Sequence, residues 1–83
     1  MVITVIYEPE FRKQFEKVKD NTFKEKVIKQ LLKIKEDPEV GKPMRYGRKG
    51  TREVYVSHYR LSYMYIKEEE KLLLLDIYHK DQQ

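Results

Sequence analysis

The segment from Thr51 to Lys80 constrains the fold most, because it holds three β-type runs in close succession. These runs are rich in Val, Ile, Tyr and Leu, the residues that favour strands. They cover Arg52–Ser57, Tyr59–Ile66 and Leu72–Tyr78, and the acid-rich residues Lys67–Lys71 form a polar turn between the second and the third. The sequence therefore predicts a β-hairpin that a third strand continues.

The middle run separates into two sets of side chains, because strand residues alternate between the two faces of a sheet. One face carries the residues that we expect in the core: Tyr59, Leu61, Tyr63 and Tyr65. The other face carries Arg60, Ser62 and Met64. This places a guanidinium in the middle of a sheet face that stays partly open. Arg60 is therefore the first candidate for a functional residue.

The first half of the chain predicts one strand and two helices. The apolar run Val2–Tyr7 has the length of a strand, and we expect it to be buried on both faces. Glu8-Pro9 begins a helix, since proline is tolerated in the first turn. Thr22 begins a second helix as the cap of the capping box Thr22-Phe-Lys-Glu25. This helix ends at Asp37-Pro38, because a residue before proline resists the α conformation.

The predicted order of elements is β-α-α-β-β-β. The two helices are joined by only a few residues, which indicates an antiparallel helical hairpin. Helices early and strands late favour an α+β fold, a twisted and mostly antiparallel sheet with the helical hairpin packed on one face. Val40–Gly50 is predicted to be a loop, and residues 1–83 are predicted to form a single domain.

Positive charge is concentrated in one part of the chain. Lys and Arg number 18 against 14 Asp and Glu, a net charge of +4. Residues 42–60 hold six basic side chains and one acidic side chain, which gives this stretch a net charge of +5. A focused positive region favours a polyanion, of which nucleic acid is the commonest. The alternative is a solvated basic loop that keeps the protein soluble.

Several classes of protein are not indicated. The chain has no cysteine, so neither a disulfide framework nor a thiolate metal site is expected. Its two histidines lie on separate runs, and no carboxylates are grouped at ligand spacing, so the sequence predicts no metal and no cofactor. The apolar stretch Leu72–Leu75 is too short to span a membrane. Nothing reads as a signal peptide, and we expect a cytoplasmic protein.

Four motifs in order resemble the RelE/ParE superfamily of toxins from type II toxin–antitoxin pairs. Lys42–Gly47 is similar to the Pro-Leu-x-x-Gly loop of that family, and Arg52–Val56 follows it. Tyr59–Tyr63 resembles the Tyr-Arg-Leu/Ile-x-Tyr strand, and Asp76–Lys80 resembles the closing strand before a His-Arg or His-Lys pair. The resemblance runs over nearly the whole chain. It implies a RelE-like fold and a RelB-like antitoxin as the cognate partner.

RelE-type members cut messenger RNA on the ribosome, whereas ParE-type members inhibit DNA gyrase. The resemblance, together with the basic stretch, predicts a metal-independent, ribosome-dependent mRNA endoribonuclease that inhibits translation, with the ribosome and mRNA as partners. Cleavage by internal attack needs a base for the 2′-OH proton, cations for the phosphate and an acid for the leaving oxygen. The predicted catalytic residues are Arg60, Lys80 and His79, and the predicted RNA-binding residues are Arg45, Arg48, Lys49 and Arg52.

The alternatives for these residues stay open. Arg60 is either a phosphate ligand, which a planar fork of donors suits, or a structural ion-pair partner of Glu53 or Asp76. On simple alternation His79 shares a face with Leu73, Leu75 and Ile77, which makes it a candidate for a half-buried structural histidine, and Lys80 projects on the Arg60 side. A tyrosine at position 46, 55 or 78 can stack on a base or simply pack in the sheet.

One departure from the family pattern favours other functions. Many RelE-type enzymes follow the closing basic pair with a tyrosine that takes part in catalysis, whereas here Asp81-Gln82-Gln83 follows Lys80. That role is either vacant, absent or moved to Tyr78 or His79. The alternatives are therefore a gyrase-inhibiting toxin of the ParE kind, or an attenuated member that binds RNA or an antitoxin without cutting.

Overall fold

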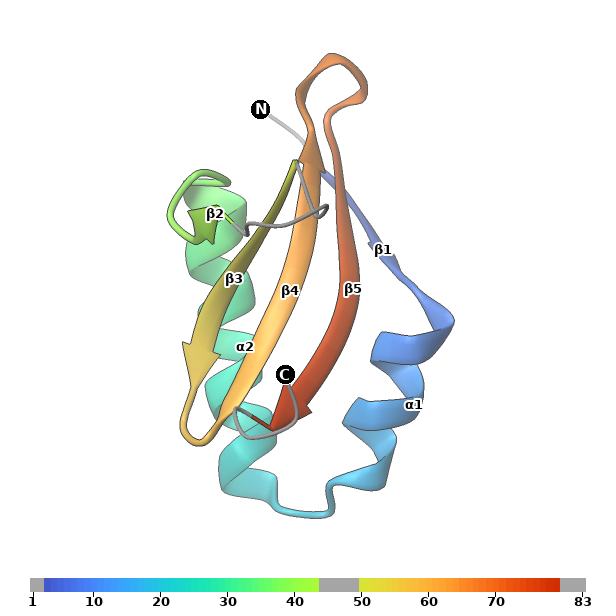
Figure 1. Cartoon of the computed structure of the whole chain (residues 1–83), viewed down its shortest axis with the longest axis vertical. Helices are drawn as coiled ribbons and strands as arrows, with labels where there is room; N and C mark the ends of the chain where they lie inside the picture. The colour runs from blue at the N-terminus through green and yellow to red at the C-terminus, as the bar shows by residue number, and fades with distance from the viewer. Residues whose placement is uncertain (1–2, 44–49, 80–83) are drawn as a thin grey trace.

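The protein folds around one five-stranded mixed sheet in the order β1-β5-β4-β3-β2 (Figure 1). The structure is a computed structural model, and it describes residues 3–43 and 50–79. Its strands are β1 (Thr4–Tyr7), β2 (Lys42–Pro43), β3 (Thr51–Val56), β4 (Tyr59–Ile66) and β5 (Lys71–His79). β1 runs parallel to β5, and the other neighbouring pairs are antiparallel. The α+β prediction with a mostly antiparallel sheet is confirmed.

Two helices precede the C-terminal strands, α1 (Pro9–Lys17) and α2 (Asn21–Glu36). α1 begins at Pro9, as predicted, where the missing N–H of proline has no helical partner to lose. α2 does not begin with a Thr22 capping box. Asp20 is its cap, and the Asp20 carboxylate accepts a hydrogen bond of 2.9 Å from the Thr22 N–H. Thr22 lies inside the first turn as a result.

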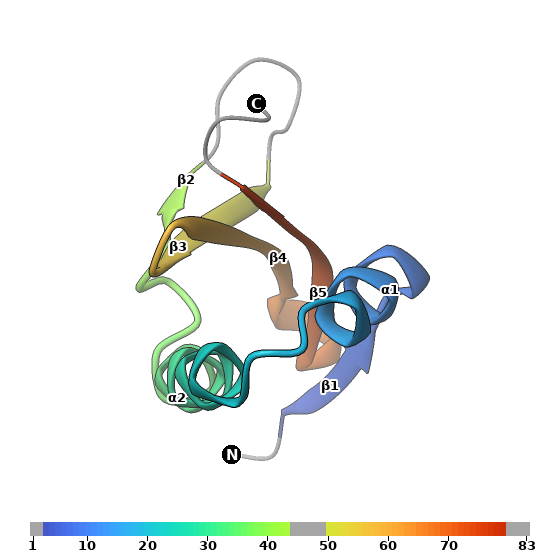
Figure 2. The ribbon, with the colours of Figure 1, turned by 90° about the horizontal axis from the view of Figure 1, so that it is seen from below.

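Both helices lie on the same side of the sheet, as predicted (Figure 2). α1 packs against β5, and α2 packs against β3. The two helices therefore cover different parts of one sheet face, with their apolar stripes turned toward the strands. We call this side the helix face of the sheet and the other side the open face.

The core lies between the sheet and the helices. Leu61 and Tyr63 of the middle strand are completely buried, as the alternation pattern predicted. The helices contribute Phe11, Phe23, Val27 and Ile34. Each such side chain contributes on the order of 1.5–3 kcal/mol when it is fully removed from water. Because Leu61 and Tyr63 face the core, the alternate residues of β4, which include Arg60, lie on the open face.

The predictions for the first strand and for Val40–Gly50 need correction. β1 is an edge strand, and its residues Thr4 and Tyr7 are exposed, so it is not buried on both faces. The segment expected to be a loop contains β2, a two-residue strand that pairs Lys42 with Glu53.

A β-bulge changes the phase of alternation in β5. Ser62 pairs with Asp76 while the next residue of β4, Tyr63, pairs with Leu74. The extra residue in β5 is Leu75, and an extra residue shifts every later side chain to the opposite face. Leu72, Leu74 and Ile77 consequently face the core. The expectation that Leu73 and Leu75 share a face with Ile77 and His79 was wrong for this reason.

Candidate functional site

The open face brings a carboxylate, a guanidinium and a phenol together. Arg60 Nη1 lies 3.1 Å from Glu53 Oε1, and the Tyr78 hydroxyl donates a hydrogen bond of 2.8 Å to Glu53 Oε2. The side chains of Arg60 and Glu53 are 25% and 13% exposed, so this ion pair is half-buried rather than fully solvated. Hydrogen bonds to charged groups contribute about 1.5–3 kcal/mol each.

Strand register explains why these three residues meet. Arg60 of β4 lies between Tyr55 of β3 and Tyr78 of β5. Glu53 is two residues before Tyr55 and so points to the same face, within diagonal reach of Arg60. The sequence left Glu53 and Asp76 as alternative partners for Arg60, and the structure assigns the ion pair to Glu53.

Arg60 keeps donors for a ligand despite this ion pair. Within residues 3–43 and 50–79, its guanidinium donates one hydrogen bond, to Glu53. A guanidinium carries five N–H donors in a fixed plane. Arg60 also lies over the ring of Tyr55, with its guanidinium carbon 4.7 Å from the ring centroid. The side chain is therefore held in place by two neighbours and can still bind an anion.

Tyr55 is an exposed aromatic residue of this face. Its exposed fraction is 51%, and Nζ of Lys42 lies 5.8 Å from its ring centroid. Lys42 comes from β2 and Arg60 from β4, the two strands that flank β3. The ring thus has a cation from each side of its own strand.

Arg52 lies elsewhere. Its neighbours Val54 and Val56 on β3 belong to the core side, and its guanidinium donates to the carbonyls of Glu39 (3.2 Å) and Gly41 (2.8 Å). The structure therefore gives Arg52 a role in holding the segment between α2 and β2. Its predicted contact with RNA stays a prediction.

Tyr63 holds the same segment from the core. Its hydroxyl accepts a hydrogen bond of 2.9 Å from the Gly41 N–H and donates one of 2.8 Å to the Pro38 carbonyl. Burial raises the pKa of this phenol above its ordinary value of 10.0, against the opposing effect of the Gly41 N–H. Local sequence patterns carried no signal for this long-range contact.

His79 is not part of the Arg60 cluster. It pairs with Tyr59 across β4 and β5, and its ring meets the Tyr59 ring edge-on at 5.4 Å between centroids. Tyr59 itself packs on Phe23 of α2, which places His79 on the helix face at the end of the sheet. Arg60 and His79 therefore lie on opposite faces. The four other predicted site residues, Lys80, Arg45, Arg48 and Lys49, lie outside the described residues.

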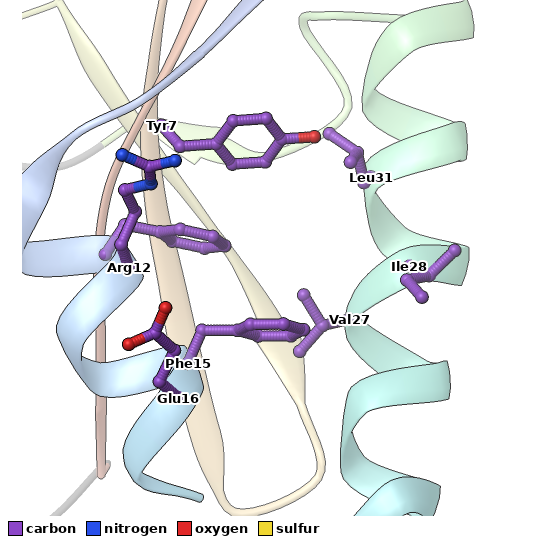
Figure 3. Close-up of a pocket in the computed structure, with 8 residues that line it drawn as sticks. Tyr7, Arg12, Phe15, Glu16, Val27, Ile28 and Leu31 are labelled. Atoms are coloured by element: carbon purple, nitrogen blue, oxygen red, sulfur yellow. The ribbon is translucent and has the colours of Figure 1, made fainter.

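A second candidate surface lies between the two helices. A pocket of about 350 Å³ is lined by side chains from β1, α1 and α2: Tyr7, Phe11, Arg12, Phe15, Glu16, Val27, Ile28 and Leu31. Figure 3 shows Tyr7 and Phe15 pointing across it toward α2. Tyr7 and Ile28 are large side chains that stay 45% and 50% exposed there. This surface is apolar where the open face is charged.

Two further features of the described part of the chain bear on the kind of site. No three His, Cys, Asp or Glu side chains in that part are grouped so that they could hold a metal ion. None of its helices has the length and apolar character that crossing a membrane requires.

Comparison with solved structures shows what fold this is. The chain has a TM-score of 0.82 and 24% identity to the RelBE2 toxin–antitoxin complex from Mycobacterium tuberculosis, covering 96% of this chain and 100% of that one. Against the intact E. coli RelBE complex the values are 0.81 and 20%, with 94% and 96% covered. Against the YoeB/ParE toxin from Agrobacterium tumefaciens they are 0.83 and 14%, with 93% and 98% covered.

The family is shown by a sequence comparison. Among curated proteins no match was found. The model of the family described as ParE toxin of type II toxin-antitoxin system, parDE, matches residues 5–83. Since this match covers nearly the whole chain, the chain belongs to the RelE/ParE superfamily and is a toxin of a type II toxin–antitoxin system.

Proposed function

We propose that this toxin cuts messenger RNA on the ribosome and thereby inhibits translation, with the open face of the sheet as its nucleic-acid side. The observation that carries the proposal is the Arg60 guanidinium, which is fixed by Glu53 and, within residues 3–43 and 50–79, has N–H donors that no other side chain or carbonyl uses. The net charge of +5 over residues 42–60 supports a polyanionic ligand.

In the proposed reaction, a ribose 2′-oxygen attacks the adjacent phosphorus, the 5′-oxygen leaves, and a cyclic phosphate forms. Arg60 binds the phosphate and stabilises the negative charge that grows on its oxygens. Glu53 holds the guanidinium in a fixed orientation, and Tyr78 holds Glu53. Of the two residues predicted from the sequence to move protons, Lys80 stays a prediction, whereas His79 lies on the face of the sheet opposite Arg60 and is given no step in this reaction.

The proposal is tested by primer extension on a defined message, translated or untranslated, in a purified translation system containing the toxin. Cuts within codons of the translated message alone are expected for the wild-type chain, and Arg60→Ala is expected to remove them. Intact message at toxin concentrations that arrest growth would contradict the proposal.

A second candidate function is inhibition of DNA gyrase. The specific observation in its favour is the family model, which carries the ParE description and matches residues 5–83. A supercoiling assay with purified gyrase separates the two. Loss of supercoiling at toxin concentrations that leave translated message intact would select gyrase as the target.

We further propose that a cognate antitoxin covers the pocket between α1 and α2. Two of the similar solved structures are toxin–antitoxin complexes. An amphipathic segment with an apolar ridge fits this pocket, because exposed apolar side chains such as Ile28 lie at it. Acidic residues beside that ridge suit the net charge of +4 of the toxin.

A further inference from the structure

We infer that Tyr55 is a stacking platform for one unpaired base of a single-stranded RNA, and that Arg60 and Lys42 bind the phosphates on either side of that base. This inference rests on the proposed function and assigns part of its substrate site. The phosphate contact given to Arg60 above depends on its charge and N–H donors and not on base stacking, so the two claims can be separated by experiment.

The position of the Tyr55 ring is the first observation. It lies on the open face with an exposed fraction of 51%, whereas the neighbouring phenol of Tyr78 is occupied by its hydrogen bond to Glu53. A tyrosine in the middle of a strand usually packs, and one that stays half exposed among charged side chains does not serve the core. A base offers an aromatic plane that every ring of this kind can stack on.

The cations around the ring are the second observation. The Arg60 guanidinium lies 4.7 Å and the Lys42 ammonium 5.8 Å from the ring centroid. They come from β4 and β2, so they reach Tyr55 from both neighbouring strands. Each nucleotide of a single strand combines a planar base with a phosphate on either side of its sugar. A ring flanked by two cations matches that arrangement.

The two cations are held differently. Arg60 is fixed by the half-buried Glu53, so its place beside Tyr55 is set when the protein folds. Lys42 is exposed on the edge strand β2 and has a flexible side chain. A base can therefore replace the Lys42 ammonium over the ring while that ammonium moves to a phosphate. The preformed half of the site lowers the ordering cost of binding.

The chemistry of the surroundings favours RNA over a protein partner at this position. Tyr55 is surrounded by Lys42, Glu53 and Arg60, all charged. The pocket between α1 and α2, by contrast, is lined mainly by aromatic and aliphatic side chains. Protein docking depends on a desolvated apolar centre, which the pocket offers and the open face does not.

The experiment measures binding of a hexaribonucleotide that carries 2-aminopurine at one position and 2′-O-methyl groups throughout, so that it cannot be cut. The wild-type chain and Tyr55→Phe are expected to bind equally and to quench 2-aminopurine fluorescence through stacking. Tyr55→Ala is expected to bind about 10-fold or more weakly. Tyr55→Leu keeps apolar area without a π face, and it is expected to behave as Tyr55→Ala does.

Inorganic tripolyphosphate is the second probe, and it separates stacking from charge. Arg60→Ala is expected to weaken both probes, whereas Tyr55→Ala weakens only the oligonucleotide. Equal losses on both probes in Tyr55→Ala would overturn the inference, since the ring would then act only by placing Arg60. Undiminished oligonucleotide binding by Tyr55→Ala, or no binding by the wild-type chain, would overturn it as well.

Two outcomes distinguish this inference from the proposed function. Stacking on Tyr55 without cleavage of any translated message would contradict the proposed endoribonuclease activity and would still support the base-stacking site. Cleavage that survives in Tyr55→Leu, with neutralisation by the antitoxin lost, would overturn the base site and assign Tyr55 to a protein interface.

Discussion

Glu53 and Arg60 form a half-buried ion pair with 3.1 Å between Oε1 and Nη1. From the sequence, a structural ion pair and an anion-binding role are alternatives for Arg60, and the structure is compatible with both. Arg60 is a structural ion-pair partner. It also retains N–H donors on an open face, because one hydrogen bond to Glu53 leaves most of the guanidinium fork unused in the part of the chain that the structure describes. Both stability and activity should therefore respond to its replacement.

Arg60→Ala is expected to lower RNA cleavage by about 10²-fold or more, the usual cost of losing one transition-state donor. It should also lower the free energy of unfolding by about 1–3 kcal/mol, because Glu53 loses a charged hydrogen-bond partner in a half-buried position. Arg60→Lys keeps the charge and loses the planar fork, so it should restore part of the activity. Cleavage and urea denaturation measured on the same purified variants check both effects.

The control for this prediction is Glu53→Gln combined with Arg60→Ala. Removing the carboxylate charge should recover much of the lost stability and none of the lost cleavage. Cleavage that stays at the wild-type level in a folded Arg60→Ala variant would remove Arg60 from the mechanism.

Glu53→Gln alone should strengthen RNA binding. The amide keeps one oxygen in place of the two that accept from Arg60 and Tyr78, while the negative charge beside Arg60 disappears. Removal of one nearby repulsive charge is expected to tighten binding a few-fold at low salt, with a smaller gain at high salt. Filter binding at two salt concentrations measures this. Weaker binding would mean that Glu53 contributes more by placing Arg60 than it costs by repelling phosphate.

Gly41 should tolerate no larger side chain. A Cβ at this position would lie 2.7 Å from the Tyr63 hydroxyl oxygen and 2.8 Å from the Glu53 carbonyl oxygen, and real Cβ atoms do not approach that closely. Gly41→Ala must therefore displace Tyr63, the segment before β2 or both. We expect a loss of about 1–3 kcal/mol in unfolding free energy, measured by urea denaturation. An unchanged midpoint would show that Tyr63 and the segment before β2 do not pack as described.

Tyr63 should make stability depend on pH above 10. Its folded pKa is raised from 10.0 by burial, so the unfolded chain loses this proton first as the pH rises. The contribution is fully present below pH 10 and is lost as the pH rises through the folded pKa. Thermal melts between pH 8 and 11 should therefore show a steeper loss for the wild-type chain than for Tyr63→Phe. Parallel curves would contradict this.

The helices, the four longer strands and the side of the sheet that the helices cover were predictable because they follow from local pattern, whereas β2 was not. Alternation through Leu61 and Tyr63 correctly placed Arg60 on the face away from the core. Alternation failed in β5, because the bulge at Leu75 is set by pairing across strands and leaves no local signature. The same limit applies to Arg60: Glu53 and Asp76 both lie opposite Ser62, and it is the packed structure that pairs Arg60 with Glu53. It applies also to the contact of Tyr63 with Gly41, residues that lie far apart in sequence.

The basic residues Arg48 and Lys49 should control the salt dependence of RNA binding. Affinity for a single strand falls with ionic strength by about 0.7 logarithmic slope units per phosphate contact. The double variant Arg48→Gln and Lys49→Gln is expected to reduce the slope by about one unit or more. Lys29→Gln with Lys33→Gln is the control, because these exposed lysines lie on α2 and away from the open face. A slope that only the control changes would place RNA on the helix side.

Replacing Ile28 should separate toxicity from neutralisation. Ile28 lines the pocket between α1 and α2 and is half exposed in the free toxin, so its remaining apolar surface is available for a partner. Ile28→Gln keeps a helix-compatible side chain of similar length and removes that apolar contact. We expect antitoxin affinity to fall about 10-fold, while growth arrest by the toxin alone is unchanged, because the open face is untouched. Lys29→Gln is the control, since it introduces the same glutamine side chain at the next, exposed position, which does not line the pocket. Titration calorimetry with purified antitoxin, together with growth on co-expression, measures both properties. Full neutralisation of Ile28→Gln at wild-type affinity would place the antitoxin on another surface.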